Sequence, residues 1–322
     1  MTGSGMNDGV RARSLAYVAF TLPELSRAHG FLLDFGFRDA GMAEGALHMA
    51  GHGREPFLYR ATEGEPGFAG LAFSVAGEAA LETLAARAGA EVEPLDAPGG
   101  GHRVRLIDPD GFVVDAVAGQ GDADPGSARP VNGWNSASAK SRIGSAKRLD
   151  ASPAHVERLG HVVLGVSDFA RSQAWYKGHF GLLTSDEIAA EDGDATGAFL
   201  RLDLGEEPTD HHSLFLAQSS GPPAFRHAAF EVRDMDDLMA GHDHLAARGH
   251  RSAWGVGRHV LGSQVFDYWF DPWGHMLEHW TDGDLFTAAD RPNVATQSDL
   301  HSVQWGPAFP ADIFARGPEG AA

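Results

Sequence analysis

The feature that most constrains the fold of this chain is an internal repeat. The segment LAYVAFTLPELSRAHGFLLDFGF begins at Leu15, and a similar segment, LGHVVLGVSDFARSQAWYKGHFGL, begins at Leu159. Each opens with a short apolar run, continues into an amphipathic stretch after a capping residue (Thr21 or Ser167), and ends near a glycine. This pattern predicts a strand, a helix and a helix stop in each half. We therefore expect the two halves of the chain to fold alike.

Two further pairs of segments extend the repeat. GLAFSVAGEAALETLAA, from Gly70, parallels HAAFEVRDMDDLMAGHDHLAA, from His227. IDPDGFVVDAV, from Ile107, parallels FDPWGHMLEHW, from Phe270, and the shared Asp-Pro-x-Gly predicts a tight turn before a strand. Side chains along that strand alternate between its two faces. The sequence therefore predicts an α+β fold of two domains, each built from paired βαβββ modules.

The expected domain boundaries follow from changes in composition. A length of 322 residues fits about two domains. We place an N-terminal domain at about 10–120 and a C-terminal domain at about 156–285. The linker between them, 121–155, is rich in Gly, Ser, Ala, Asn and Lys. The tail, 286–322, carries aromatic residues among prolines, and we expect part of it to pack near the functional site.

Composition excludes several classes of function. Lys and Arg total 25 and Asp and Glu total 44, so the formal net charge is −19. Nucleic acids and anionic membranes bind basic surfaces, so neither is expected as the main partner. The absence of cysteine rules out disulfides, cysteine zinc sites and a thiol nucleophile. The segment MTGSGMNDGVRARS lacks the apolar stretch of a signal peptide, and no apolar run approaches the roughly 18 residues of a membrane span, so we expect a cytoplasmic protein.

The two halves differ at three matched positions that matter for metal binding. The C-terminal half carries His161, His227 and Glu278 on three predicted strands. Taken singly, each histidine would more often be a packed residue, but a carboxylate facing inward from the apolar strand HMLEHW needs a partner. Two imidazoles and one carboxylate suit Fe(II) and leave coordination positions open. The matching residues of the N-terminal half cannot form this set, because they are Tyr17, Gly70 and Asp115.

The repeat and this ligand pattern resemble the vicinal oxygen chelate superfamily and, within it, the two-domain type I extradiol catechol dioxygenases. The resemblance covers about residues 10–310 and is strongest over 159–285. Beyond the three ligands it rests on HHSLFL, which places His212 fifteen positions before the second ligand. It also rests on a Gly-Arg-His element ending at His259, with Tyr268 nine positions later and the ligand Glu ten positions after that.

The resemblance implies a fold, a reaction and a set of roles. The modules would form open, barrel-like mixed sheets around a non-haem Fe(II) site, with Mn(II) as the alternative metal. The reaction would be cleavage of a catechol-type ring beside its diol by O2, in a homo-oligomeric protein. His212 would act as an acid/base beside the O2 site, Tyr268 would hydrogen-bond a substrate oxygen, and His259 would assist substrate binding or deprotonation.

Two departures from the family pattern bear on the substrate. Relatives that act on carboxylated, homoprotocatechuate-like catechols carry Arg where this chain has Trp254, and Asn where it has Val163. Both replacements make the substrate-binding pocket more apolar. We therefore expect a neutral, hydrophobic or alkyl- or aryl-substituted catechol.

Other interpretations remain open at this point. A metal-dependent isomerase or lyase of the glyoxalase type would share the fold, but such enzymes usually draw metal ligands from two modules. A non-catalytic small-molecule binder would generally lack the metal ligands. His211 neighbours His212 in a predicted strand and so points to the opposite face, which favours a surface or structural role. The same kind of role is expected for His179, His242, His244, His250, His275, His279 and His301.

Overall fold

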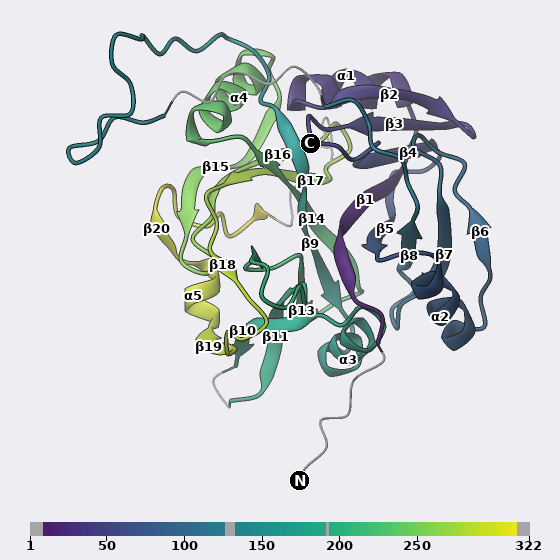
Figure 1. Ribbon diagram of the computed structural model, residues 1–322. Helices are drawn as coiled ribbons and strands as arrows, with labels where there is room; N and C mark the ends of the chain where they lie inside the picture. The colour runs from purple at the N-terminus through teal and green to yellow at the C-terminus, as the bar shows by residue number, and fades with distance from the viewer. Residues whose placement is uncertain (1–8, 126–132, 191–192, 314–322) are drawn as a thin grey trace.

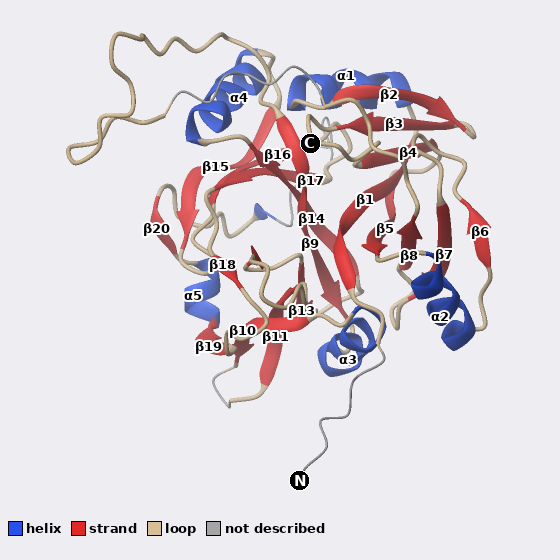
Figure 2. Cartoon of the chain, viewed as in Figure 1, coloured by secondary structure: helices blue, strands red, loops and turns tan. Residues whose placement is uncertain are grey.

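The computed structural model describes residues 9–125, 133–190 and 193–313, and each half of the chain forms one large mixed sheet (Figures 1 and 2). The N-terminal sheet has the strand order β2-β3-β4-β1-β5-β8-β7-β6. Its elements are β1 (Ala12–Leu22), α1 (Leu25–Phe35), β2 (Arg38–Ala43), β3 (Ala46–Ala50), β4 (Tyr59–Glu63), β5 (Gly67–Val75), α2 (Glu78–Ala88), β6 (Val92–Pro94), β7 (His102–Ile107) and β8 (Val113–Ala118).

The C-terminal sheet repeats this plan and curls into an open half-barrel. Its order is β19-β10-β11-β13-β9-β14-β17-β16-β15-β20. The repeated elements are β9 (Val156–Val166), α3 (Phe169–Phe180), β10 (Leu183–Ala189), β11 (Ala195–Arg201), β13 (Leu214–Gln218), β14 (Ala224–Val232), α4 (Met235–Ala247), β15 (Arg251–His259), β16 (Val265–Phe270) and β17 (Met276–Thr281). The predicted α+β fold of paired βαβββ modules is confirmed.

Local sequence explains where the repeated elements begin and end. Asp168, rather than Ser167, caps α3 by accepting a hydrogen bond from the backbone of Arg171, and Gly181 ends the helix with φ 67°. In the first half the capping position is Glu24 rather than Thr21, and its side chain makes no cap. The predicted capping residues were therefore wrong. An N-cap side chain accepts a hydrogen bond from the backbone N–H two or three residues further on, as Asp168 does from Arg171. A small shift of the helix start is therefore enough to change which residue can cap it.

The Asp-Pro-x-Gly turns are built as the sequence predicts. Oδ1 of Asp271 accepts hydrogen bonds from the backbone N–H groups of Trp273 and His275, at 2.9 and 2.8 Å. Gly274 takes φ 90° in this turn, a conformation in which glycine avoids the strain of a side chain. The turn fixes where β17 begins. Because successive side chains of a strand point to opposite faces, Glu278 faces one side of the sheet and His279 the other.

The two sheets pack against each other over a shared apolar core. The largest cluster of buried side chains draws on both halves, and the rings of Phe73 and Phe180 lie 4.5 Å apart in it. Nε2 of His279 lies 2.7 Å from the carbonyl oxygen of Phe35, on the face of β17 that points to the N-terminal half. The predicted structural role of His279 agrees with this contact.

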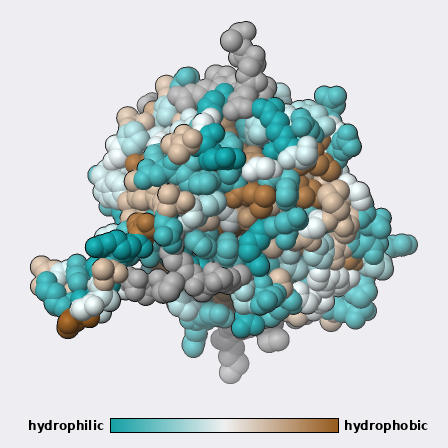
Figure 3. All heavy atoms as spheres, turned by 90° about the horizontal axis from the view of Figure 1, so that it is seen from above, coloured by the Kyte–Doolittle hydropathy of each residue, from teal (hydrophilic) through white to brown (hydrophobic). Residues whose placement is uncertain are grey.

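The segment that connects the two halves of the chain extends away from the two sheets. Part of the predicted linker, 126–132, lies outside the described residues, and 133–150 projects from the two sheets as a loop (Figures 1 and 3).

The face seen in Figure 3 is mainly hydrophilic, as a net charge of −19 would suggest. No helix in the described ranges is long and apolar enough to cross a membrane. The remaining short elements are β12 (Thr209–Asp210), β18 (Leu285–Phe286), β19 (Asn293–Thr296), α5 (Gln297–His301) and β20 (Val303–Trp305).

Candidate metal centre

The three predicted ligands come from neighbouring strands of the C-terminal sheet. His161 on β9 lies opposite Ala229 on β14, and Ala229 lies opposite Glu278 on β17. His227 precedes Ala229 by two residues and so shares its face of the strand. The next strand, β16, places Tyr268 opposite Glu278. Strand pairing therefore brings all four side chains to one face of the half-barrel.

The ligand atoms converge closely. Nε2 of His161 and Nε2 of His227 lie 3.2 Å apart, and Oε2 of Glu278 lies 3.1 Å from the first and 3.2 Å from the second. Glu278 is fully buried. No described residue donates a well-formed hydrogen bond to either of its carboxylate oxygens. The three atoms form a nearly equilateral triangle around a common centre, and the two histidine nitrogens in it also lie within hydrogen-bond distance of each other.

This triangle has the dimensions of a metal site. Two donors bound about 2.1 Å from one ion, at a right angle to each other, lie about 3.0 Å apart. Burial raises the pKa of Glu278, but its two histidine neighbours lower it by more, so the net pKa lies well below its usual range. Burial lowers the pKa of His227, although Glu278 opposes the shift. An ionised carboxylate beside a neutral imidazole is the form that binds a divalent metal.

A glycine sets the depth of the first ligand. A Cβ on Gly160 would meet the indole of Trp280 at 2.4 Å, so this position in β9 admits no larger residue without a shift. Trp280 lies on β17, two residues after Glu278. β14 lies between β9 and β17, so the indole of Trp280 reaches across it to the backbone next to His161. This packing explains why the ligand follows a glycine in the sequence.

His212 lies against the three candidate ligands and belongs to a chain of polar groups. Its ring centroid is 4.1 Å from that of His161 and 4.8 Å from that of Phe199. Nδ1 of His212 lies 3.1 Å from Nδ1 of His211, and Nε2 of His211 lies 2.8 Å from Oδ2 of Asp186. His211 is buried and contacts His212, so of the surface or structural role expected for it the surface alternative was wrong, and a structural role agrees with these contacts. Both histidines precede β13 in an irregular segment, where strand alternation does not apply.

Two further predicted residues form a second polar pair beside the ligands. Nε2 of His259 lies 3.0 Å from the hydroxyl of Tyr268 and 3.9 Å from Oε1 of Glu278. Burial raises the pKa of Tyr268 well above its usual value, and the carboxylate adds to the rise. Burial also lowers the pKa of His259 to about 4, although Glu278 opposes this. At neutral pH the pair is therefore a phenol beside a neutral imidazole.

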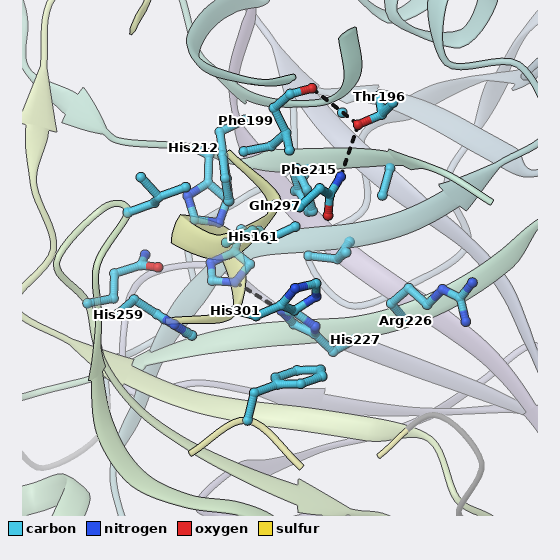
Figure 4. Close-up of a pocket in the computed structure, with 18 of the residues that line it drawn as sticks. His161, Thr196, Phe199, His212, Phe215, Arg226, His227, His259, Gln297 and His301 are labelled. Carbon is cyan, nitrogen blue, oxygen red and sulfur yellow. Dashed lines mark hydrogen bonds between the residues drawn. The ribbon is translucent and has the colours of Figure 1, made fainter. Parts of the chain in front are cut away.

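These groups line a cavity of about 280 Å³ (Figure 4). Figure 4 shows His161 and His227 side by side, with His212 and His259 flanking them. Trp254 and Val163, the two positions singled out for substrate contact, both line this cavity. Most of the wall is apolar, and its other apolar side chains are Ile188, Phe199, Phe215, Ala217, Leu261, Leu300 and Phe309.

Sequence reasoning missed part of the site. Asp186 carried no signal, because its contact with His211 joins β10 to a segment 25 residues away. His301, expected to be structural or solvated, lines the cavity from α5, and its ring lies 4.8 Å from that of Phe309. The indole N–H of Trp254 donates to the carbonyl oxygen of Pro307 at 2.9 Å and so ties the tail to the cavity wall. Aromatic residues among prolines were the only signal in the tail.

Comparisons with known proteins agree with this geometry. A family model described as the Glyoxalase/Bleomycin resistance protein/Dioxygenase superfamily matches residues 158–279. Metapyrocatechase 2 of Cupriavidus necator is 32% identical over 312 residues, which span 95% of this chain and 92% of that protein. All three predicted ligands lie inside the segment that the family model matches.

Two solved structures share the fold at lower identity. Homoprotocatechuate 2,3-dioxygenase from Brevibacterium fuscum matches with a TM-score of 0.77 at 17% identity, over 99% of this chain and 96% of that one. A Mn(II)-bound glyoxalase from Novosphingobium aromaticivorans matches with a TM-score of 0.73 at 22% identity, over 94% and 93%. The fold alone does not separate these two activities, and the sequence relationship to the metapyrocatechase does. The chain belongs to the glyoxalase/bleomycin resistance protein/dioxygenase superfamily and, within it, to the extradiol ring-cleaving dioxygenases.

Proposed function

We propose that His161, His227 and Glu278 hold Fe(II), and that the protein uses O2 to cleave the ring of a catechol beside its diol. In this reaction the carbon–carbon bond next to the diol breaks, both atoms of O2 enter the product, and no external reductant is needed. The observation that carries the proposal is the triangle of donor atoms, 3.1 to 3.2 Å apart, at the wall of a largely apolar cavity. Two imidazoles and one carboxylate leave room for both diol oxygens and O2.

The chemistry supplied by a bound Fe(II) ion is a positive charge that acidifies a catechol hydroxyl and a route for electrons from the diol to O2. The chain's own contribution begins with orientation. All three ligands come from strands of one sheet, so the open face of the site has a fixed direction. The aromatic and aliphatic wall then excludes water around the reacting groups.

His212 is proposed to move a proton at Nε2. A carboxylate only accepts hydrogen bonds, so Nε2 of His211 donates to Asp186, and Nδ1 of a neutral His211 is then an acceptor. Nδ1 of His212 therefore donates to His211, which leaves Nε2 of His212 free to accept a proton. Burial and neighbouring histidines keep the pKa of His212 well below its usual value, so this nitrogen starts unprotonated. It can take a proton from the substrate and return it to a reduced oxygen.

Tyr268 and His259 are proposed to position the diol. The raised pKa of Tyr268 keeps its hydroxyl protonated, so it can donate a hydrogen bond to a deprotonated substrate oxygen. His259 lies 3.0 Å from that hydroxyl and, as a neutral imidazole, can accept the other of the diol's two protons. Figure 4 shows His259 and His212 both beside the candidate ligands, at separate positions in the cavity.

The substrate is proposed to be a neutral catechol with an apolar substituent. Trp254 and Val163 line the cavity where relatives for carboxylated catechols carry Arg and Asn, and both are almost fully buried. Arg226 also lines the cavity, but on the side away from His259 (Figure 4). A ring carboxylate placed against Trp254 would lose its hydration without gaining a charged partner there.

Turnover of paired substrates tests this proposal. With Fe(II)-loaded protein, kcat/KM should be at least about tenfold higher for 4-ethylcatechol than for 3,4-dihydroxyphenylacetate. A preference for the carboxylated catechol would contradict the substrate class. Apo-protein reloaded with Fe(II) or Mn(II), with activity expressed per bound ion, tests the metal, and the larger activity should follow Fe(II). A homo-oligomer and a cytoplasmic location stay predictions; light scattering checks the first.

A further inference from the structure

The N-terminal half carries a second polar site at the place that corresponds to the metal centre. Tyr17 on β1 lies opposite Ala72 on β5, Ala72 lies opposite Asp115 on β8, and Asp115 lies opposite Arg105 on β7. In the other half the same three pairings join His161, Ala229, Glu278 and Tyr268. Each half of the repeat therefore brings polar side chains together on the corresponding face of its sheet, but the side chains differ between the two halves.

The contacts of this second site exclude a metal of the same kind. The hydroxyl of Tyr17 donates to Oδ2 of Asp115 at 2.7 Å. Arg105 donates to both carboxylate oxygens, at 3.1 and 3.3 Å. Burial raises the pKa of Tyr17 far above its usual value, and Asp115 adds to the rise. The carboxylate is thus fully engaged with hydrogen-bond donors, and the phenol remains protonated.

Positive charge is in excess at this site. Arg103 donates to Glu93 at 2.8 Å, and its guanidinium lies 3.7 Å from Asp115. Arg60, on β4, has no hydrogen bond or ion pair with any residue in the described ranges. Together with Arg105, three guanidinium groups face two carboxylates, in a protein whose net charge is −19. One cationic group is left to be balanced by something other than this chain.

The space beside these groups is open. A hollow of about 150 Å³ is lined by all three arginines together with Tyr17 and Asp115. Gly70, at the position that matches His227, has φ 146°, and a Cβ there would meet the carbonyl oxygen of Val113 at 2.6 Å. This position therefore contributes no side chain, and the hollow stays unfilled. The side chains of Arg103 and Arg105 are 20% and 46% exposed, so solvent reaches it.

We propose that this hollow binds a small oxyanion, a carboxylate or a phosphate, through Arg60, Arg103 and Arg105. Guanidinium groups recognise both anions by paired N–H donors, and partial burial strengthens each contact relative to water. The hollow is large enough for phosphate or acetate and too small for a second aromatic substrate with a long substituent. The site is separate from the metal centre, since none of its residues lines the cavity there.

Isothermal titration calorimetry on metal-loaded protein tests the proposal, with sodium phosphate and sodium acetate titrated in turn against a chloride background of matched ionic strength. At least one of the two anions should bind, and the comparison tells which. Arg60→Gln should weaken binding roughly tenfold to a hundredfold, because charged hydrogen bonds are lost. Arg54→Gln is the matched control: it removes the same charge from an arginine whose side chain is 76% exposed, and should leave binding unchanged.

A variant of the metal centre separates this site from anions that bind the metal. In His227→Ala, binding should persist at the wild-type dissociation constant. Loss of binding in His227→Ala, or its retention in Arg60→Gln, would overturn the proposal, because the anion would then sit elsewhere. The absence of heat from both anions in the wild-type protein would overturn it as well.

Discussion

Nδ1 of His212 lies 3.1 Å from Nδ1 of His211. Because His211 also lies 2.8 Å from Asp186 through Nε2, the carboxylate determines which nitrogen of His212 carries a proton. Asp186 and His211 do not line the cavity, but through this contact they set the tautomer of His212, which does line it.

Asp186→Asn should slow turnover without releasing the metal. An amide can donate as well as accept, so His211 is no longer held in one tautomer, and Nε2 of His212 is no longer kept free for a proton. Changes of this kind around an oriented histidine typically cost roughly tenfold to a hundredfold in activity. Steady-state O2 uptake and metal content should be measured together. Glu187→Gln, one residue along β10, is the control, and equal effects of the two changes would rule out the specific role of Asp186.

His212→Phe should retain the metal and lose most of the oxygen chemistry. The ring of phenylalanine fills the same space against Phe199 and His161 but cannot accept a proton. Acid–base groups typically contribute about 10²- to 10⁴-fold to a rate, so turnover should fall within that range. Single-turnover kinetics on anaerobically prepared, substrate-bound protein measure the step directly. Unchanged turnover with full metal content would remove His212 from the mechanism.

Tyr268→Phe should lower kcat/KM for the diol by about tenfold or more, because a hydrogen bond to a charged oxygen is lost. The hydroxyl contacts His259 at 3.0 Å, while the ring packs against Trp254, so the change leaves the packing in place. Titration of the anaerobic protein with substrate, followed by absorbance, separates binding from turnover. A variant with wild-type affinity and wild-type rate would show that Tyr268 only fills space.

Folding stability should depend on pH through Asp237. Burial raises the pKa of this carboxyl, but hydrogen bonds from the ring and backbone of His155 lower it by more, to a net value below the usual one. A depressed pKa in the folded state means that the stabilising contribution is present above the unfolded pKa of about 3.9 and is lost as pH falls below it. Asp237→Asn should therefore cost about 1–3 kcal/mol at pH 7.

Urea unfolding at several pH values measures this effect. The difference in unfolding free energy between wild type and Asp237→Asn should shrink as pH falls below about 4. A difference that stays constant down to the lowest pH at which both proteins fold would show that the contact is not ionic.

The convergence of the three proposed ligands could be predicted from sequence because it depends on repetition and strand alternation. His161, His227 and Glu278 lie at matched places in the repeat, and pairing of β9, β14 and β17 brings them together. The contact between Asp186 and His211 could not be predicted, since it depends on how an irregular segment meets β10. The position of Arg60 in the same hollow as Asp115 could not be predicted either, because it depends on the pairing of β4 with β1. Contacts across strands that are distant in sequence need the folded register.

The central claim is that the three-donor centre carries out extradiol cleavage. The most direct test mixes anaerobically purified, Fe(II)-loaded protein with a panel of catechols, admits O2, and follows O2 uptake together with the yellow absorbance of a ring-opened product. We predict uptake with yellow product in the wild-type protein and in a control variant, His29→Ala, whose histidine lies on α1 and does not line the cavity, and neither in His227→Ala. Iron-loaded wild-type protein that consumes no O2 with any catechol, or a His227→Ala variant as active as wild type, would contradict the account.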